Sequence, residues 1–316
     1  MGMLVDGRWE STPVHQGAAK DEGGKFVRRP ATFRDRIEPG ARFAPEAGRY
    51  HLYVSLACPW AHRTLVVRSL KKLEAAVGIS IVDSFMDDDG WAFRERRGST
   101  PDLVNGTEFL REIYLLADPR FTGKVTVPVL WDTRERTIVN NESRDIIVML
   151  DQAFHTPGSI ELYPEGQRAA IDSMIDANYE TVNNGVYRSG FARTQEAYDE
   201  AVTDLFARLD ALDAHLGRSR YLVGEAITLA DVALYTTLLR FDAVYHGHFK
   251  CNLRRIADYE NLAPYLRDLY REPAFKAYAD FDHIKDHYYR SHPTLNPTRI
   301  VPKGPVLDLD RPSGRG

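Results

Sequence analysis

The 316-residue sequence predicts an α/β domain followed by an all-α domain. Residues 50–83 have the pattern of a strand, a helix and a second strand, a unit in which the two strands run parallel. After the stretch 157–166, which contains Pro and Gly, the regular segments as far as residue 280 all have helical periodicity. This contrast places the domain boundary within 157–166.

The α/β pattern rests on short segments that are typical of strands and amphipathic helices. We expect strands at 50–54, 79–83, 125–131 and 137–139. We expect one helix to begin at Pro59, a second to cover 108–117 after a Thr107 cap, and a third to cover 144–154. The second half predicts helices at 167–183, 195–216, 228–245, 261–271 and 273–280. The polar stretch 86–106 is long for a loop in a compact domain, which is typical of a functional or mobile segment.

These elements divide the chain into four regions. Residues 1–48 are rich in Gly, Pro and charge, and we expect an extended N-terminal arm over a folded core. Residues 49–157 form the predicted α/β domain, and 166–290 form the all-helical domain. Residues 291–316 contain several prolines and are expected to lie on the surface as a C-terminal tail.

The composition is that of an ordinary globular protein, with 43% hydrophobic and 27% charged residues. The 41 basic and 45 acidic side chains give a net charge of −4, which argues against a nucleic-acid partner. No apolar run approaches the ~20 residues that span a bilayer, and no signal peptide is evident, so we expect a soluble cytoplasmic protein without a membrane partner. Two cysteines exclude a disulfide scaffold and favour a reducing compartment.

Cys58 is the strongest candidate for chemistry, because it lies where a predicted strand meets a predicted helix. Pro59 suits the first turn of that helix, where its missing N–H is not needed. A thiolate at a helix N-terminus faces unpaired N–H groups and the positive end of the helix dipole, which lowers the pKa of a cysteine. The alternative is a buried cysteine that packs as a small hydrophobic residue.

The spacing around Cys58 indicates a mechanism with one thiol. A dithiol oxidoreductase has a second cysteine three residues on, where this chain has Ala61. Cys251 is far away in the sequence, and we expect it to be structural or incidental. A mixed disulfide at Cys58 would therefore be resolved by an external thiol such as glutathione.

Two further dipeptides are candidates for ligand binding. Val127-Pro128 is either an edge-strand proline or a cis proline in a bend whose exposed backbone could pair with a peptide such as glutathione. Glu142-Ser143 opens a predicted helix, so Ser143 and the helix N–H groups can bind a carboxylate, while Glu142 can accept from an ammonium group. Ordinary N-capping is the alternative for this pair, and both roles are compatible.

Other patterns carry no predicted chemistry. The Thr228–Asp231 segment has the form of a capping box and is expected to be structural. His283 and His287 have a spacing that can bind zinc, but Ile284 stands where a metalloprotease has Glu. We therefore expect no metal.

The combined motifs resemble those of the glutathione transferase superfamily, and most closely its Xi class, the glutathionyl-hydroquinone reductases. The resemblance extends from about residue 49 to 310. It rests on the segments CPWAHR (58–63), GW (90–91), TVPVLW (126–131), IVNNES (138–143), VNNGVY (182–187), HFKCN (248–252), FDHI (281–284) and HYYRSH (287–292). It implies a thioredoxin-like N-terminal domain plus an all-α C-terminal domain, the glutathione transferase fold.

The resemblance also implies a reaction. The Cys58 thiolate attacks the sulfur of an S-glutathionyl-hydroquinone, hydroquinone leaves, and glutathione as co-substrate resolves the mixed disulfide to oxidised glutathione. Alternatives are another cysteine-type glutathione transferase activity, such as a lyase or a dehydroascorbate or thiol transferase, and a non-catalytic module that binds aromatic ligands. The resemblance further implies a homodimer through the helical domain.

The family's site residues carry over to positions of this sequence. Glutathione contacts are implied for Trp91, Val127, Glu142 and Ser143. They are also implied for Lys124, which stands where a basic residue of the family, an arginine in some relatives, holds the glycyl carboxylate of glutathione. Catalytic roles beside the hydroquinone are implied for Tyr187 and Tyr288, where a hydroxyl can donate or position a proton. Tyr289 adjoins Tyr288, and the sequence does not decide which of the two lines the pocket.

Overall fold

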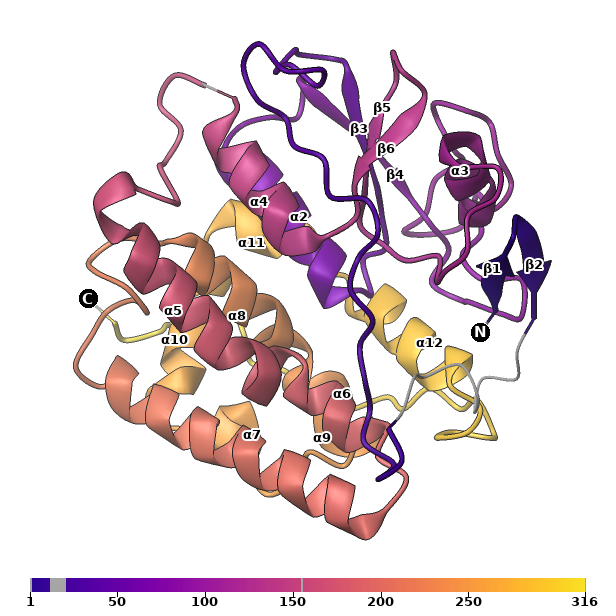
Figure 1. Cartoon of the computed structure of the whole chain (residues 1–316). Coiled ribbons are helices and arrows are strands. Elements are labelled where there is room, and N and C mark those ends of the chain that lie inside the picture. Colours follow the sequence, from indigo (N-terminus) through magenta and orange to yellow (C-terminus); the bar gives the residue numbers. More distant parts are fainter. Residues whose placement is uncertain (1, 12–20, 155, 316) are drawn as a thin grey trace. The chain divides into compact units, whose positions relative to one another are not determined.

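A computed structural model describes residues 2–11, 21–154 and 156–315 (Figure 1). The chain divides into two compact units. The first unit comprises Met1–Gly17, Pro30–Ile160 and Asp280–Val301. The second comprises Ala18–Arg29, Glu161–Ala279 and Pro302–Gly316. The α/β character of the first and the helical character of the second confirm the predicted fold class.

The first unit is built on a four-stranded mixed sheet in the order β4-β3-β5-β6. The strands are β3 (Tyr50–Val54), β4 (Val77–Ile81), β5 (Val129–Asp132) and β6 (Thr137–Asn140). β3 pairs parallel with β4, as the sequence predicts, and antiparallel with β5. Every residue of β3 is buried, because helices cover both faces of the sheet (Figure 1).

Three helices pack on this sheet. α2 (Pro59–Leu70) and α4 (Ser143–Gln152) lie side by side on one face, and α3 (Leu110–Ala117) contacts β6 from the other (Figure 1). α3 begins at Leu110 because the Glu112 carboxylate accepts from the Phe109 N–H at 2.9 Å. The expected cap, Thr107, instead donates to Asp102 at 2.8 Å, so that part of the prediction was wrong.

Two strand boundaries also differ from the prediction. The third strand was expected from residue 125, but the ladder begins at Val129, since Pro128 has no N–H to donate. The second strand was expected at 79–83 and lies at Val77–Ile81, two residues earlier. After the end of this strand the Val82 N–H still donates to the Val54 carbonyl of β3 at 2.9 Å, whereas the Asp83 N–H donates to the Ala92 carbonyl, outside the sheet.

The N-terminal region is less extended than expected. β1 (Met3–Val5) and β2 (Arg8–Glu10) form an antiparallel hairpin in the first unit. Asp6 and Gly7 turn the chain with positive φ values of 45° and 76°, a conformation that an Asp-Gly pair favours. The hairpin is attached to the unit where the Leu4 and Gly123 backbones exchange hydrogen bonds of 3.0 and 2.9 Å.

The second unit is a group of helices around α8 (Leu229–Arg240), every residue of which is buried. The other helices of this unit are α5 (Arg168–Asn178), α6 (Gly185–Gly190), α7 (Gln195–Leu216), α9 (His246–His248), α10 (Leu262–Tyr270) and α11 (Pro273–Lys276), with short 3-10 segments at Glu165–Gln167 and Ile256–Asp258. Five-residue π segments, Tyr179–Asn183 and Phe241–Tyr245, continue α5 and α8 where the sequence predicted unbroken helices.

The Thr228 capping box is present at the start of α8, and it is structural. Asp231 accepts from the Thr228 N–H at 2.8 Å and from the buried Tyr265 hydroxyl at 2.7 Å. Burial raises the pKa of Asp231, while these hydrogen bonds oppose that shift. The carboxyl therefore joins the helix start to α10.

The last helix belongs to a different unit from the one expected. The sequence placed 166–290 in the helical domain, but α12 (Phe281–Ser291) groups with the first unit. Its partners lie about two hundred residues upstream: Ser84 donates to Asp286 at 2.7 Å, and the Met86 N–H donates to Ser291 at 3.0 Å. The sequence predicted helices only as far as residue 280, so it indicated neither α12 nor the surface that this helix covers.

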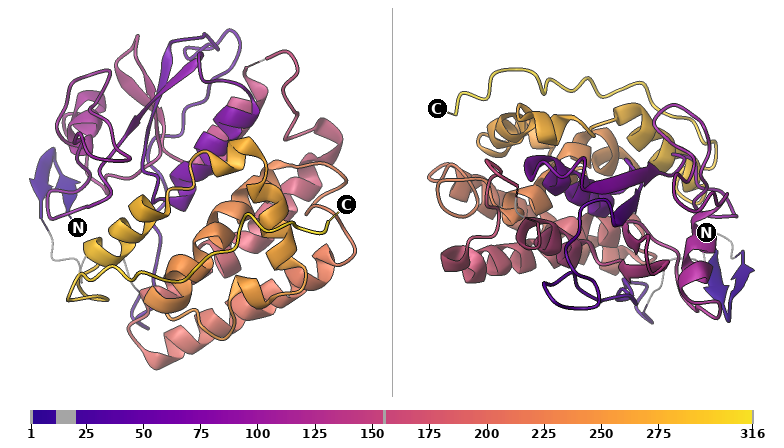
Figure 2. Two further views of the ribbon diagram at one scale, coloured as in Figure 1. Left: turned by 180° about the vertical axis from the view of Figure 1, so that it is seen from behind. Right: turned by 90° about the horizontal axis from the view of Figure 1, so that it is seen from above.

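The C-terminal residues follow α12 without forming a further helix or strand among the described residues, as Figure 2 shows. Residues 302–315 group with the second unit, where Arg315 donates to the carbonyls of Ser219 and Arg220 at 2.7 and 2.8 Å. No described helix combines the length and the apolar character that crossing a bilayer requires.

Candidate functional site

Cys58 occupies the N-cap of α2. Its backbone is extended (φ −78°, ψ 120°), Pro59 is the first helical residue, and the Cys58 carbonyl accepts from the His62 N–H at 2.9 Å. The Cys58 N–H donates to the Ser55 carbonyl at 3.2 Å, and this hydrogen bond closes the turn between β3 and α2. The half-buried thiol therefore lies at the positive end of the helix dipole.

The Val127–Pro128 peptide bond is cis. It lies directly before β5, and the Val127 carbonyl accepts from the Cys58 thiol at 3.5 Å. The thiol and the predicted peptide-binding backbone thus meet in the structure.

The strand directions explain why these segments meet. β3, β4 and β6 run in one direction, and β5 runs in the other. Cys58 follows β3, Trp91 lies in the segment after β4, Val127 precedes β5, and Glu142 follows β6. All four segments therefore lie at one edge of the sheet, which we call the thiol edge.

Glu142 and Ser143 open α4 at the thiol edge. Glu142 is the N-cap, and its side chain accepts from the Arg144 N–H at 3.1 Å. The Asn140 side chain supports the turn by accepting from the Glu142 N–H at 2.7 Å. Capping uses one carboxylate oxygen of Glu142, and each carboxylate oxygen has further lone pairs, so capping does not preclude a ligand ammonium.

Tyr114 joins two of these segments, a role that the sequence did not predict. Its buried hydroxyl donates to the Thr126 carbonyl at 2.9 Å and accepts from the Asn141 side chain at 3.1 Å. Burial raises the pKa of Tyr114, so the hydroxyl stays protonated. It fixes the chain before Val127 against the chain before Glu142.

Lys124 is half-buried and follows Gly123, the residue that pairs with Leu4 of the N-terminal hairpin. The hairpin therefore braces the backbone that carries Lys124. It also braces the segment before Trp91, because the Trp9 indole donates to the Asp88 carbonyl at 3.1 Å.

Trp91 is 8% exposed, and its indole stacks on the imidazole of His287, with ring centroids 4.8 Å apart and planes 20° apart. Gly90, before it, has φ of 85° and lies so close to the Trp9 ring that an added Cβ would be 3.0 Å away. Only glycine fits both conditions without strain. The sequence suggested His287 as a metal ligand and as part of the HYYRSH segment, but not as a partner of Trp91.

Tyr288 lies on α12 and is 2% exposed, with the rings of His287 and His292 at 5.3 and 5.7 Å. Tyr289 is half-buried, and burial raises the pKa of its hydroxyl. Both tyrosines belong to the unit that contains Cys58.

Tyr187 belongs to the second unit and lies in an aromatic cluster with Phe26, Phe191, Tyr245 and Phe249. The Arg28 guanidinium is 5.0 Å from the Tyr187 ring centroid, and Arg28 donates to Asn184 at 3.0 Å. Residues 21–29 of the predicted arm are thus part of the helical unit, which the sequence did not indicate.

The described residues contain no group of three or more His, Cys, Asp or Glu side chains that could hold a metal ion. His283 and His287, the candidate pair, have other partners: His283 lies 3.5 Å from Ser55, and His287 Nδ1 lies 2.9 Å from the Ser84 carbonyl.

Comparisons with known proteins agree with this geometry. Residues 57–153 match the family model "Glutathione S-transferase, N-terminal domain", and 195–268 match "Glutathione S-transferase, C-terminal domain". A Xi class GST from Natrialba magadii is 52% identical, with a TM-score of 0.94 over 100% of this chain and 97% of that chain. The chain belongs to the Xi class of the glutathione S-transferase family.

A named relative of this Xi-class transferase matches along almost its whole length. Glutathionyl-hydroquinone reductase YqjG from Escherichia coli (strain K12) is 49% identical over 100% of this chain and 98% of its own. The glutathione-bound structure of YqjG has a TM-score of 0.89 and 47% identity over 99% of both chains. The predicted family and the glutathione transferase fold are confirmed.

Proposed function

We propose that this Xi-class transferase is a glutathionyl-hydroquinone reductase, which removes glutathione from S-glutathionyl-hydroquinones. The observation that carries the proposal is the thiol edge, where the Cys58 thiol at a helix N-terminus lies 3.5 Å from the Val127 carbonyl. The name of the full-length relative YqjG supports the same activity.

The first step is an attack by the Cys58 thiolate on the sulfur of the glutathionyl-hydroquinone. The helix N-terminus stabilises that anion. A disulfide forms between Cys58 and glutathione, the carbon–sulfur bond breaks, and its electron pair stays on the ring carbon, which takes up a proton. In the second step a glutathione thiolate attacks the mixed disulfide, which gives oxidised glutathione and regenerates Cys58.

The start of α2 provides no second thiol to compete with the second glutathione, because Ala61 occupies the position of a resolving cysteine. Cys251 is fully buried, and burial raises its pKa to about 12, so it does not supply a thiolate. Two molecules of glutathione thus pass through the cycle, one from the conjugate and one from solution.

Residues of the thiol edge suit the binding of the glutathionyl group. We assign the Val127 backbone to the peptide of glutathione, Glu142 to its ammonium, and Ser143 with the α4 N-terminus to its γ-glutamyl carboxylate. We assign Trp91 and Lys124 to the remainder of the tripeptide, with the Lys124 charge directed to the glycyl carboxylate.

Two tyrosines are proposed to serve the leaving hydroquinone. Tyr288 is the better supported by position, because its helix belongs to the same unit as Cys58 and carries the partner of Trp91. The family resemblance supports Tyr187. A tyrosine hydroxyl can donate the proton that the ring carbon takes up or hold the phenolic oxygen.

The test compares wild-type protein with Cys58→Ser on a model glutathionyl-hydroquinone in the presence of glutathione. We expect equimolar hydroquinone and oxidised glutathione from the wild type, and a loss of roughly a thousandfold or more in the variant, since the nucleophile is removed. Circular dichroism of both proteins controls for folding. Equal turnover by the variant, or a new thioether without oxidised glutathione, would contradict the proposal, and the thioether would indicate a lyase.

Two further proposals follow from the family resemblance. We propose a homodimer through the helical unit, which sedimentation equilibrium tests directly, and a monomer at micromolar concentration would contradict it. We also propose a cytoplasmic location, because the cycle consumes reduced glutathione and needs Cys58 as a thiol.

A further inference from the structure

The indole of Trp91 has a single well-oriented stacking partner among the contacts described for it, the imidazole of His287 on α12. The ring planes differ by 20° and the centroids are 4.8 Å apart, which is an offset stack at close range. Both side chains are nearly buried, with 8% and 7% exposed. The orientation of the indole therefore depends on where the imidazole is held.

His287 is itself fixed by the segment that carries Trp91. Its Nδ1 lies 2.9 Å from the Ser84 carbonyl. A carbonyl only accepts, so Nδ1 carries the proton and donates. One side chain of α12 thus contacts both the start and the end of the segment 84–91, through a hydrogen bond to Ser84 and a stack on Trp91.

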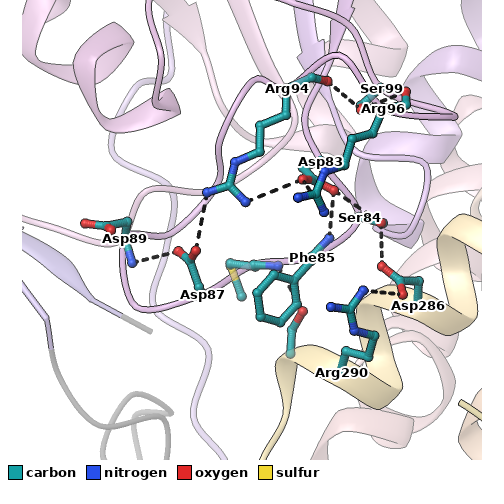
Figure 3. Close-up of polar contacts among 12 residues, drawn as sticks. Asp83, Ser84, Phe85, Asp87, Asp89, Arg94, Arg96, Ser99, Asp286 and Arg290 are labelled. Carbon is teal, nitrogen blue, oxygen red and sulfur yellow. Dashed lines mark hydrogen bonds and ion pairs between the residues drawn. The ribbon is translucent and has the colours of Figure 1, made fainter. Parts of the chain in front are cut away.

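Polar contacts fasten the rest of α12 to the same segment (Figure 3). Ser84 donates to Asp286 at 2.7 Å, and Arg290 pairs with Asp286 at 2.9 Å while its guanidinium lies 4.6 Å from the Phe85 ring centroid. Asp83 holds the other side of the segment, since its carboxylate accepts from the Phe85 N–H at 3.2 Å and lies 3.6 Å from Arg94. These contacts leave the imidazole little freedom to move.

We propose that His287 is a positioning residue that sets the indole of Trp91 for glutathione. The inference rests on the proposed function, because it takes Trp91 as a glutathione contact. It gives α12 a role in co-substrate binding in addition to carrying Tyr288. The face of the imidazole positions the indole by stacking on it, and the hydrogen bond to Ser84 keeps that face in place.

Two substitutions separate the ring from the hydrogen bond. His287→Phe keeps an aromatic face against Trp91 but loses the donor to Ser84. His287→Asn keeps an N–H donor near the position of Nδ1 but loses the ring. We expect glutathione affinity to fall several-fold, up to about tenfold, in His287→Asn, and to stay within about threefold of wild type in His287→Phe.

Calorimetric titration with glutathione, in a Cys58→Ser background that cannot form the mixed disulfide, measures these affinities. The second readout is the fluorescence emission of Trp91, which is identified as the part of the tryptophan emission that Trp91→Phe removes. This emission should change when the indole loses its stack on His287, because its surroundings change. His283→Asn is the matched control: it is one turn earlier on α12 and equally buried, and we expect it to leave the Trp91 emission unchanged.

The outcomes are distinct. Weaker binding and altered Trp91 emission in His287→Asn, with both retained in His287→Phe, support the inference. Wild-type affinity in a folded His287→Asn, with binding lost in Trp91→Phe, would overturn it while the proposed function stands. Unchanged affinity in Trp91→Phe would overturn both the assignment of Trp91 and the inference.

A measurement on the wild-type protein tests the inference even if the variants do not fold. In wild-type protein labelled at histidine carbons, the His287 ring signal should shift when glutathione binds, because the ligand contacts the indole that is stacked on this ring. A His287 signal that glutathione does not move would contradict the inference.

Discussion

The surroundings of the two cysteines differ in almost every respect that controls thiol chemistry. Cys58 is half-buried at the start of α2, with a backbone carbonyl 3.5 Å from its sulfur. Cys251 is fully buried in the second unit, after α9, where its sulfur lies 3.9 and 3.8 Å from the carbonyls of Val186 and Phe249. Burial raises the pKa of Cys251 to about 12, so it is a neutral thiol at physiological pH.

Position in the fold, and not residue type, therefore controls the reactivity of a cysteine. A thiolate needs a partner for its charge and access to an electrophile, and the thiol edge provides the first through a helix N-terminus. Around Cys251, burial outweighs the favourable contributions of Ser189 and Lys250 to a thiolate, and the fully buried sulfur is closed to an electrophile.

The largest expected effect is on turnover. Cys58→Ser should lower deglutathionylation roughly a thousandfold or more, because Cys58 is the proposed nucleophile, whereas Cys251→Ala should stay within about twofold of wild type. Steady-state rates with a model glutathionyl-hydroquinone measure both. A large loss of turnover in a well-folded Cys251→Ala variant would contradict the claim that the two cysteines differ in their role.

Alkylation compares the two thiols without any substrate. The pKa of Cys251 is about 12 against an ordinary value of 9.0, so its thiolate fraction at pH 8 is reduced about a thousandfold, and burial slows its reaction further. Iodoacetamide on the folded protein at pH 8 should therefore modify Cys58 alone, and Cys251 should react only after denaturation. Peptide mass spectrometry identifies the modified residue, and equal labelling of both cysteines would contradict this picture.

Glutathione affinity should depend on Glu142 at the start of α4. Glu142→Gln can keep the cap to the Arg144 N–H but loses the charge, so we expect binding to weaken about 10- to 100-fold with little change in stability. Thr194→Ala is the matched control, since it removes the cap at the start of α7 in the second unit. It should cost about 1 kcal/mol of stability and leave the affinity unchanged.

If Glu142→Gln binds glutathione as wild type does, its carboxylate serves only as a cap. The assignment of the ammonium group would then be wrong, although the role of Cys58 would be untouched.

The smallest effect is expected from the N-terminal hairpin. Trp9→Phe removes the hydrogen bond from the indole to the Asp88 carbonyl while it keeps a ring against Gly90. We expect a loss of about 1 kcal/mol in the free energy of unfolding and a loss of at most several-fold in glutathione affinity. Thermal unfolding and titration measure the two. A variant that loses all affinity would show that the hairpin belongs to the binding site itself.

Local signals predicted the elements of the fold that lie on short, contiguous segments. The strand at 50–54, Pro59 as the first helical residue and the helix at 195–216 are present as expected. In each case the pattern of side chains within one segment decides the conformation. The parallel pairing of β3 and β4 follows from the strand-helix-strand order.

Contacts between distant segments could not be predicted in this way. His287 was visible as one of two histidines a turn apart, but its partner Trp91 lies far upstream in the sequence. The same separation explains why α12 was assigned to the helical domain, and why Tyr114 was not recognised as the link between Thr126 and Asn141. The Asp6-Gly7 turn was a local signal for the hairpin that the interpretation of 1–48 as an extended arm did not use.

The most direct test of the central claim is to trap the mixed disulfide. Wild-type protein is mixed with one equivalent of a glutathionyl-hydroquinone in the absence of free glutathione, quenched with acid and analysed by intact and peptide mass spectrometry. We predict one glutathionyl group on the peptide that contains Cys58, with one equivalent of hydroquinone released, and its removal when glutathione is added. Hydroquinone release without an adduct, or an adduct on Cys251, would contradict the claim that Cys58 carries the reaction.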